Sequence, residues 1–513
     1  MSKTTRRSFL KSSALGVSGV AGIAASLGSP TARAAESKSP GAASPVAGPT
    51  YRLAREIPVE KGFDLIVAGG GPAGTAAAVC AARLGAKVLL LEATGCLGGM
   101  GTSGLVTAFD PMANGQRMLV GGLMREIVTT MHQRGFLAPH VTADFYSKRY
   151  HCWTPFRVEG YKIVLDELVT AAKVDVRFYT RLVKVDADAA TGTVRGVVAH
   201  NIEGLRYLEA KMFVDATGDA VLTTLCGAKV REAGRDTPHI MPPTLCSLCG
   251  GIDWTRAKKH VDSTGPDHQQ ELIEKAVAEH HFSHRDRHVP GLFQVGHSLG
   301  MLNAPHVFHT DALRCRSLSD AMIHGRQLAQ EYISFYRKYV PGCENLEQVI
   351  TGSLLGVRES RRIVGEYEMT MADYLGRRQF PDQIAVFNKA VDIHVYDDSD
   401  AEYQRYFNEY NKTGRLKPGE CYGIPYSILV PKGWRNLWAA GRCNSSDVQV
   451  HGSIRVQPAA SMMGQAVGTA AVQAIATGQP ACELDTARLV ETLRKNGAYL
   501  PQTELSKTMT RIL

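Results

Sequence analysis

The sequence lacks the features that mark membrane, fibrous or disulfide-rich proteins. Beyond residue 34, no apolar run approaches the roughly 20 residues that a membrane-spanning helix requires. The 50 glycines and 23 prolines among 513 residues fall well short of a low-complexity chain. Eleven cysteines are too few for a disulfide scaffold of this length. Because 44% of the residues are hydrophobic, we expect a globular protein with two or more domains.

The chain also lacks concentrated charge outside its first residues. The formal net charge is +9, but residues 1–34 contribute five Lys and Arg residues and no acid. The remainder is nearly balanced, so we expect no nucleic-acid partner.

The first 34 residues have the pattern of an export signal. The pair Arg6-Arg7 precedes a short, weakly apolar stretch, and Ala32-Arg33-Ala34 has the small-x-small pattern of a processing site. This arrangement resembles a twin-arginine signal peptide. We expect cleavage and a periplasmic or secreted protein rather than a membrane anchor. Residues 35–60, rich in Pro and Ser, then form a flexible leader.

A dinucleotide-binding pattern follows the leader. The apolar run 63–68 predicts a buried strand that enters the turn containing Gly69, Gly71 and Gly74. In such a turn the first glycine permits the bend, the second lets backbone N–H groups approach a pyrophosphate, and the third lets the helix pack on the strand. A helix to about residue 84, a strand over 86–91 and the acid Glu92 complete a β-α-β unit.

Three further glycine-rich segments extend this pattern. A glycine-dense loop covers residues 94–104, and two strands enter glycine turns at 211–219 and 436–442. A helix of small residues is predicted from about 458 to 477, with Pro458 at its start. Separate segments that return to one sheet suit a long, extended ligand.

These motifs resemble those of FAD-dependent oxidoreductases of the glutathione-reductase-type fold. The chain is most similar to the bacterial xanthan-lyase-like branch, a relative of fumarate reductase flavoproteins and thiazole-biosynthesis proteins. Further matching segments are 121–126, 356–367, 392–394 and 451–456. The resemblance implies FAD and an α/β fold in which a discontinuous Rossmann-like FAD-binding domain carries an inserted α+β cap or substrate domain.

The resemblance also implies which residues meet FAD. Gly69, Gly71, Gly74 and Glu92 would hold the ADP half, and Val183 would meet adenine through its backbone. Arg442 stands where many relatives carry an acid for the ribityl chain. The remaining residues assigned to the cofactor are Pro72, Ala73, Gly98, Gly99, Thr102, Gly218, Asp219, Gly441 and Gly464.

Four residues are candidates for catalysis. His451 and Arg455 precede the last helix on a predicted loop, where His suits proton transfer and Arg holds an oxyanion. Arg358 lies in an Arg-rich segment whose helical spacing would place it beside Arg361 and Arg362, as an anion pocket or as a salt-bridge network. His394 is a second acid–base candidate. For both histidines, a structural role in the interior is the alternative, and for Arg455 the alternative is an ion pair with an acid.

No metal site is expected. Cys246 and Cys249 lie in a probable strand, where their side chains would point to opposite faces, and their role stays open. His280, His284 and His288 could share one helical face, but the residues around them are typical of a solvated segment.

The expected domain order is 61–240 for the first part of the FAD-binding domain, 241–415 for the substrate or cap domain, and 416–485 for the second part. Residues 486–513 would form a tail. The predicted activity is oxidation of a small organic substrate by hydride transfer to flavin N5, with oxygen, a quinone or a redox protein as electron acceptor. The alternatives are a fumarate-reductase-like reduction of an activated C=C bond and a non-catalytic electron carrier. The oligomeric state is left open.

Overall fold

The computed structural model describes residues 51, 53–142, 145, 153–261, 268–287, 289, 291–413 and 415–501. The chain divides into two units, residues 1–53 and residues 54–513. The predicted signal peptide and the first part of the leader lie outside the described residues. Within the described residues, no helix combines the length and the apolar character needed to cross a membrane.

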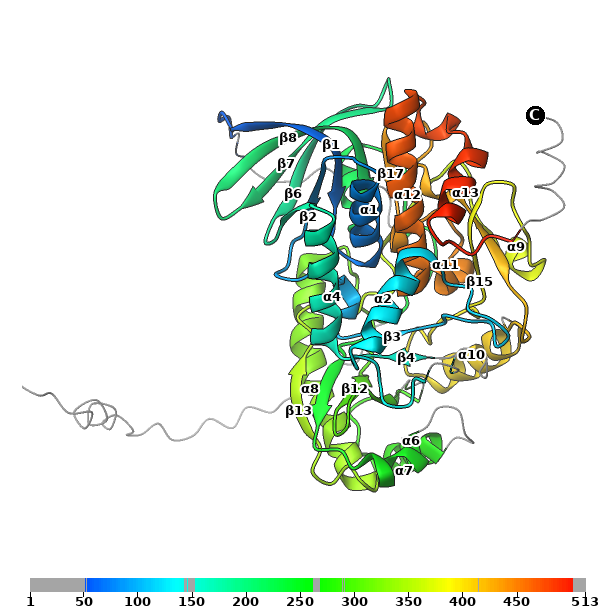
Figure 1. Cartoon of the computed structure of the whole chain (residues 1–513). Helices are drawn as coiled ribbons and strands as arrows, with labels where there is room; N and C mark the ends of the chain where they lie inside the picture. The colour runs from blue at the N-terminus through cyan, green and yellow to red at the C-terminus, as the bar shows by residue number, and fades with distance from the viewer. Residues whose placement is uncertain are drawn as a thin grey trace, which may run out of the picture. The chain divides into compact units, whose positions relative to one another are not determined.

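The centre of the fold is a seven-stranded sheet (Figure 1). Strands β5, β2, β1 and β8 run parallel, whereas β7 and β6 continue the sheet beyond β8 in antiparallel order. In this order the strands are β5 (Asp175–Arg177), β2 (Val88–Leu91), β1 (Val59–Ala68), β8 (Gly204–Asp215), β7 (Thr193–Asn201) and β6 (Arg181–Asp188). The short strand β17 (Leu437–Ala439) pairs in parallel with the last three residues of β8.

This sheet unites the three stretches that the sequence predicted to meet. The last four residues of β1 and all of β2 are apolar and buried, and such runs form the buried parallel part of α/β sheets. Because β1, β8 and β17 are parallel, their carboxyl ends meet at one edge of the sheet, and each end enters a glycine turn. Ligands of open α/β sheets bind at this edge.

Two helices of small residues pack against each other beside the sheet. They are α1 (Pro72–Arg83) and α12 (Gln457–Thr477), and Figure 1 shows them side by side. A Cβ added to Gly464 would lie 2.0 Å from the carbonyl oxygen of Ala73. The two helices therefore approach closely only because this position has no side chain.

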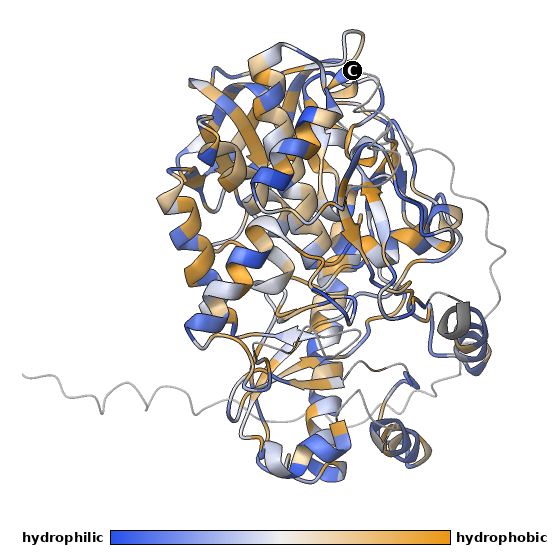
Figure 2. Ribbon diagram, turned by 45° about the vertical axis from the view of Figure 1, so that its right-hand side comes forward, coloured by the Kyte–Doolittle hydropathy of each residue, from blue (hydrophilic) through white to orange (hydrophobic). Residues whose placement is uncertain are grey.

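Residues 247–351 form a separate layer, which we call the cap. Its sheet has the order β11, β12, β10, β13 and is covered by a long helix, α8. In Figure 1 the cap occupies the lower part of the molecule, and Figure 2 shows the predominantly hydrophobic colouring of its strands. Its elements are β10 (Ser247–Gly250), α6 (Trp254–Val261), α7 (His268–Ala278), β11 (Gly291–Gln294), β12 (Gly300–Asn303), α8 (Cys315–Tyr339) and β13 (Glu347–Thr351).

Smaller elements join the cap to the central sheet and complete the fold. The helices are α2 (Gly122–Gln133), α4 (Val158–Ala171), α5 (Val221–Leu225), α9 (Met371–Leu375), α10 (Asp400–Thr413), α11 (Val448–Ile454) and α13 (Thr486–Lys495). The strand pairs are β3 (Ala108–Phe109) with β4 (Thr154–Pro155), β9 (Val230–Glu232) with β14 (Arg361–Ile363), and β15 (Gln383–Phe387) with β16 (Tyr422–Pro425).

Several local expectations are wrong. Arg361 and Arg362 lie in the strand β14, not in a helix, because their backbone pairs with β9. The helix α7 ends at Ala278, and His280 has a positive φ of 55°, so His280 and His284 do not share a helical face. His288 lies outside the described residues. The expected tail contains α13, which buries Leu489, Val490 and Leu493.

Candidate active site

A large cavity begins at the glycine turns of the central sheet and extends into the cap. Its volume is about 1550 Å³, and its lining includes Gly69, Gly218 and Gly441 from the turns and Trp254 and Leu292 from the cap. Ligand pockets for drug-sized molecules measure roughly 300–1,000 Å³. This cavity therefore has room for a large cofactor together with a second molecule.

The first glycine turn forms a cradle at one end of the cavity. Gly69 has a φ of 97°, and a Cβ there would lie 2.5 Å from the carbonyl oxygen of Ala216. A Cβ on Gly74 would lie 1.7 Å from the carbonyl oxygen of Gly69. A Cβ on Gly71, in contrast, would meet nothing within 4 Å and would project into open space. Gly71, Pro72 and Ala73 line the cavity, so the turn leaves room for a phosphate at the N-terminus of α1.

Glu92 lies beside this cradle and holds the turn together. Its Oε2 accepts a 2.7 Å hydrogen bond from the Gly70 N–H, and its Oε1 accepts one of 2.7 Å from the Thr94 N–H. The remaining lone pairs are available to hydroxyl groups of a ligand, because the carboxylate lines the cavity. At the start of β6, Arg181 and Leu182 line the cavity, whereas Val183, the residue expected to meet adenine, does not, and its side chain is 46% exposed.

The last two glycine turns are joined by an ion pair. Asp219 accepts a 2.7 Å hydrogen bond from Nη2 of Arg442 and one of 2.6 Å from the Ser360 hydroxyl. Arg442 also donates from Nε to the Gly218 carbonyl, at 2.8 Å, and from Nη1 to the Val357 carbonyl, at 2.9 Å. Arg442 therefore connects the turns, and Asp219 is the acid that lines the cavity at this point.

The glycine-dense loop and α12 form the next part of the wall. Gly99 and Met100 line the cavity, but Gly98 and Thr102 are not among its lining residues. Thr102 instead donates a 2.6 Å hydrogen bond to the Leu97 carbonyl and stabilises the loop. Val456, Gln457 and Ala460 bring the N-terminus of α12 to the cavity. Gly464 lies outside the lining, at the contact with α1.

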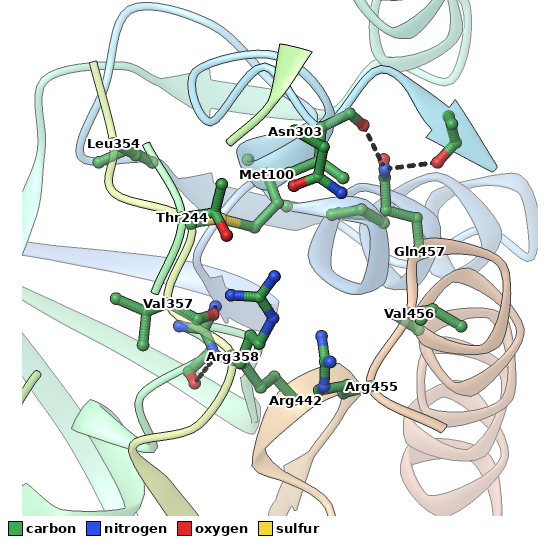
Figure 3. A pocket seen from close by; sticks show the side chains of 18 of the residues that line it. Met100, Thr244, Asn303, Leu354, Val357, Arg358, Arg442, Arg455, Val456 and Gln457 are labelled. Atoms are coloured by element: carbon green, nitrogen blue, oxygen red, sulfur yellow. Dashed lines mark hydrogen bonds between the residues drawn. The ribbon is translucent and has the colours of Figure 1, made fainter. Parts of the chain in front are cut away.

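Arg358 and Arg455 lie on one side of the cavity, opposite Thr244 and Asn303 (Figure 3). Burial and the nearby Arg455 lower the pKa of Arg358 to about 10. Arg358 donates a hydrogen bond to the Pro242 carbonyl, and no ion pair joins it to a carboxylate among the described residues. Nε of Arg455 is buried and has no hydrogen-bond partner within the described part of the chain.

Asp392 is the carboxylate beside these two cations. Arg455 Nη2 donates to Asp392 Oδ2 at 3.2 Å, and Lys389 Nζ lies 4.0 Å from the same oxygen. Burial alone would raise the pKa of Asp392, but Lys389, His394 and Arg455 together hold it well below its ordinary value. Lys389 also pairs with Asp110. Burial would lower the pKa of Lys389, but the two carboxylates raise it.

His394 lies at the cavity, but His451 does not. His394 Nε2 is 3.3 Å from Asp392 Oδ1, and both residues line the cavity. His451 lies on α11 rather than on a loop, is fully buried and is not among the lining residues. Its Nε2–H donates to the Arg442 carbonyl at 2.8 Å. Burial and the neighbouring Arg362 hold its pKa well below the ordinary value, so the structure places a neutral His451 behind the cavity wall.

The other candidates have structural surroundings. Arg361 and Arg362 pair with Glu232 and Asp236, at 2.9 and 2.7 Å, so this segment contains a salt-bridge network in addition to Arg358. Cys246 and Cys249 are buried, reduced thiols. Burial raises the pKa of each thiol to about 12. Among the residues that the structure describes, no group of three His, Cys, Asp or Glu side chains has the arrangement of a metal site.

Residues 64–493 match the family described as FAD dependent oxidoreductase. The chain belongs to this family. The match covers the central sheet, the cap and α12, and it makes the protein an FAD-dependent enzyme.

The solved structures that the chain matches have low identity. A geranylgeranyl bacteriochlorophyll reductase-like protein from Thermoplasma acidophilum is 13% identical, with 88% of this chain and 91% of that chain covered and a TM-score of 0.43. The myxobacterial chondrochloren halogenase is 16% identical, with 86% and 79% covered and a TM-score of 0.42. The anhydrotetracycline hydroxylase from Streptomyces rimosus is 12% identical, with 84% and 65% covered and a TM-score of 0.40.

The cavity of this FAD-dependent oxidoreductase suits its cofactor. The open space at Gly71 would take the pyrophosphate, and Glu92 would take the ribose. Gly441 and the N-terminus of α12 would lie along the flavin half, where the positive end of the helix favours negative charge.

Sequence reasoning missed four charged or polar residues of this site: Asp110, Lys389, Asp286 and His306. Asp110 and Lys389 are 279 residues apart, whereas His306 lies 20 residues from Asp286 and 88 from His394. No local spacing pattern indicates such pairs. A lysine within an otherwise apolar buried stretch, as at Lys389 after β15, is the only cue that the sequence offers.

Proposed function

We propose that this FAD-dependent oxidoreductase oxidises a small organic substrate whose anionic group is held by Arg358 and Arg455. The observation that supports the proposal is the position of these two guanidinium groups. Arg358 is buried, the Arg455 side chain is 12% exposed, and both line the cavity beside the N-terminus of α12. Asp392, the carboxylate that pairs with Arg455, is shared with Lys389. A substrate carboxylate or alkoxide would compensate the positive charge and would pair with the planar guanidinium groups.

The residues have separate tasks in this reaction. When bound, FAD supplies the hydride acceptor. Arg358 and Arg455 bind and orient the substrate, and the apolar cap residues Trp254 and Leu292 cover the far part of the cavity and exclude water. The His394–Asp392 pair exchanges the proton that leaves the substrate O–H or N–H. Because His451 lies behind the wall, we no longer propose it as the proton acceptor, and we assign it to holding the Arg442 turn.

A panel of matched donors tests this proposal. A 2-hydroxy acid and its amide, an amine, an alcohol and a sugar are each mixed with the oxidised holoenzyme without oxygen, and flavin reduction is followed by stopped-flow absorbance. The acid should reduce the flavin faster than its amide. Arg358→Met should abolish this preference while FAD stays bound, because it removes one cation. Reduction by the amide at the same rate as by the acid contradicts the anion site.

Further measurements on the same holoenzyme distinguish the alternative reactions. Reoxidation of dithionite-reduced enzyme by an unsaturated acid in the absence of oxygen would favour reduction of an activated C=C bond. Peroxide released after turnover in air would identify an oxidase, whereas transfer to a quinone or a redox protein would identify a dehydrogenase. No turnover with any donor, together with rapid electron exchange with a protein, would favour the electron carrier.

We also propose export by the twin-arginine pathway and membership of the xanthan-lyase-like branch. Both rest on sequence motifs, Arg6-Arg7 with Ala32-Arg33-Ala34 for export and the segments 356–367 and 451–456 for the branch. The N-terminus of the protein recovered outside the cytoplasm should follow Ala34. Replacing both Arg6 and Arg7 by Lys should leave the precursor in the cytoplasm. Export of the double variant at the normal rate would contradict this route.

A further inference from the structure

Four polar groups, three of them buried, form a row that ends at Asp392, the carboxylate paired with Arg455. Asp286 Oδ2 lies 2.8 Å from His306 Nδ1, and His306 Nε2 lies 3.0 Å from His394 Nδ1. His394 Nε2 lies 3.3 Å from Asp392 Oδ1. At the cavity end, His394 and Asp392 are lining residues. Asp286 and His306 are fully buried and are not part of the lining.

The number of protons in this row follows from its hydrogen bonds. Three contacts, from Asp286 through His306 and His394 to Asp392, need three protons. Two carboxylates and two neutral imidazoles carry only two, because each neutral imidazole has one N–H and a carboxylate has none. The fully hydrogen-bonded row therefore carries one proton more than its neutral imidazoles provide, and its net charge is −1.

The charges around the row are consistent with this count. Lys389 and Arg455 face Asp392 and keep the additional proton away from it at rest. Arg358 lies near His306, and its positive charge opposes protonation of the His306 ring. Burial also lowers the pKa of His306, although Asp286 raises it.

The far end of the row leads toward the surface of the cap. The hydroxyl of the buried Tyr332 hydrogen-bonds to Asp286, and it lies 3.5 Å from Nε2 of His284. His284 Nδ1 is 4.0 Å from Glu331 Oε2, and the Glu331 side chain is 26% exposed. His284 Nδ1 has no hydrogen-bond partner among the described residues, so the hydrogen-bonded groups end at His284, and a gap of 4.0 Å separates its ring from the partly exposed Glu331 carboxylate.

We propose that Asp286, His306, His394 and Asp392 form a proton relay between the cavity and the surface of the cap. Each of the three protons can cross its own hydrogen bond. When all three have crossed, the proton carried by one terminal carboxylate has been replaced by a proton on the other terminal carboxylate. The row still holds three protons. This role rests on the proposed function, in which substrate oxidation releases a proton into the cavity.

The relay conserves atoms and electrons in each turnover. Oxidation breaks the substrate C–H bond, whose electron pair leaves as hydride to the flavin oxidant, and forms a C=O or C=N bond. The proton of the substrate O–H or N–H passes to Asp392. One proton leaves from Asp286 through Tyr332, so the row holds three protons again. Reduction of a substrate would use the same row in the opposite direction.

An NMR measurement tests the row without any substrate. Holoenzyme labelled with ¹⁵N-histidine should show a scalar coupling between two imidazole nitrogens, one from His306 and one from His394. It should also show a strongly deshielded N–H proton that persists from pH 5 to pH 8. His306→Gln and His394→Gln should each remove both features. The control His281→Gln, which alters a half-buried histidine bonded to the Glu331 carbonyl, should leave them unchanged.

Kinetic measurements then test the transfer itself. With any donor that reduces the flavin, His306→Gln should lower the reduction rate about 100-fold at unchanged FAD content and donor affinity, within the range of general acid–base effects. It should also diminish the solvent deuterium isotope effect. Tyr332→Phe should keep the deshielded proton of the row but slow the reduction.

The two measurements separate failure of the relay from failure of the proposed function. Two histidines that titrate independently in the wild-type spectrum, without internitrogen coupling, overturn the relay even where the variants do not fold. A coupled pair combined with an unchanged reduction rate in His306→Gln overturns it as well, because the row is then structural. If no donor reduces the flavin, the proposed oxidation is wrong and the relay has no substrate proton to carry. The internitrogen coupling is measured without substrate, so it still shows whether His306 and His394 share a proton.

Discussion

Gly71 and Gly74 lie three residues apart at the start of α1, yet a methyl group at each meets different surroundings. At Gly71 the φ of −69° suits any L-residue and the methyl group points into open space. Gly71→Ala should therefore change the thermal midpoint of the apoprotein little, whereas FAD occupancy should fall at least about 10-fold because the cradle is filled. Absorbance of the purified protein gives the FAD-to-protein ratio, and circular dichroism gives the midpoint.

Gly74→Ala is the matched variant. Its Cβ would lie 1.7 Å from the Gly69 carbonyl oxygen, so the turn and α1 would have to separate. We expect the free energy of unfolding to fall by at least about 1–3 kcal/mol. Normal FAD content in Gly71→Ala, or a fully stable Gly74→Ala, would show that the turn does not form the predicted cradle.

Arg455 offers a second prediction for a single residue. Arg455→Lys keeps the positive charge but loses the planar donor pair, so the affinity for an acidic donor should fall about 10- to 100-fold. The dissociation constant is obtained from the concentration dependence of flavin reduction. Arg83→Lys is the control, since Arg83 forms a bidentate pair with Glu126 at the surface. Equal affinities in Arg455→Lys and the wild type would remove Arg455 from substrate binding.

At the scale of elements, the contact between α1 and α12 leads to a prediction of unusual sign. Replacing a glycine by alanine inside a helix usually stabilises it by about 1 kcal/mol. Gly464→Ala should instead destabilise the protein by several kcal/mol, because its Cβ would lie 2.0 Å from the Ala73 carbonyl oxygen and would push the helices apart. Thermal unfolding of the holoenzyme measures the effect.

Gly325→Ala in α8 is the control for this contact. Its Cβ would meet only side-chain atoms, those of Leu245 and Val307, at 3.1–3.2 Å. These side chains can adjust, so the gain in helix propensity should offset the closer packing and the midpoint should change little. A similar loss in both variants would mean that glycine at position 464 has no special role in the packing of α12.

The elements that the sequence predicted well are those with strong local patterns. The apolar run before Gly69 and the small-residue helix after Pro458 appear as β1 and α12, within a few residues of their expected bounds. In these segments, turn residues and apolar periodicity agree with the tertiary structure.

The elements that sequence reasoning missed are set by distant partners. The segment around Arg361 has helical charge spacing, but pairing with β9 makes it a strand. His451 is a residue type suited to proton transfer, but its position on α11 places it outside the cavity lining. The His306–His394 contact joins residues 88 positions apart, and no periodicity in the sequence reports it.

At the scale of the whole molecule, the site depends on one topological feature. The parallel strands β1, β8 and β17 come from three separate parts of the chain and end at the same edge of the sheet. The turns at this edge form one end of the cavity, and the cap closes the other. Asp286 and His306 belong to the cap, whereas the glycine turns belong to the sheet, so residues of the cap can change without altering these turns.

The pH dependence of folding provides a test of the whole molecule. The pKa of His451 is held well below its ordinary value by burial and by Arg362, whereas in the unfolded chain it is about 6.5. Below pH 6.5 the unfolded chain therefore binds a proton that the folded chain does not bind. The stability should fall as the pH decreases from about 6.5 toward the folded-state pKa, by up to about 1.4 kcal/mol per pH unit for this group.

His451→Gln should weaken this dependence, because glutamine can still donate to the Arg442 carbonyl but does not titrate. The thermal midpoint, measured from pH 7 to pH 5 at equal FAD saturation, should fall less steeply in His451→Gln than in the wild type. The exposed His200 supplies the control, since His200→Gln should leave the slope unchanged. A wild-type slope retained in His451→Gln would mean that His451 is protonated in the folded protein, and its placement as a neutral residue behind the cavity wall would then be wrong.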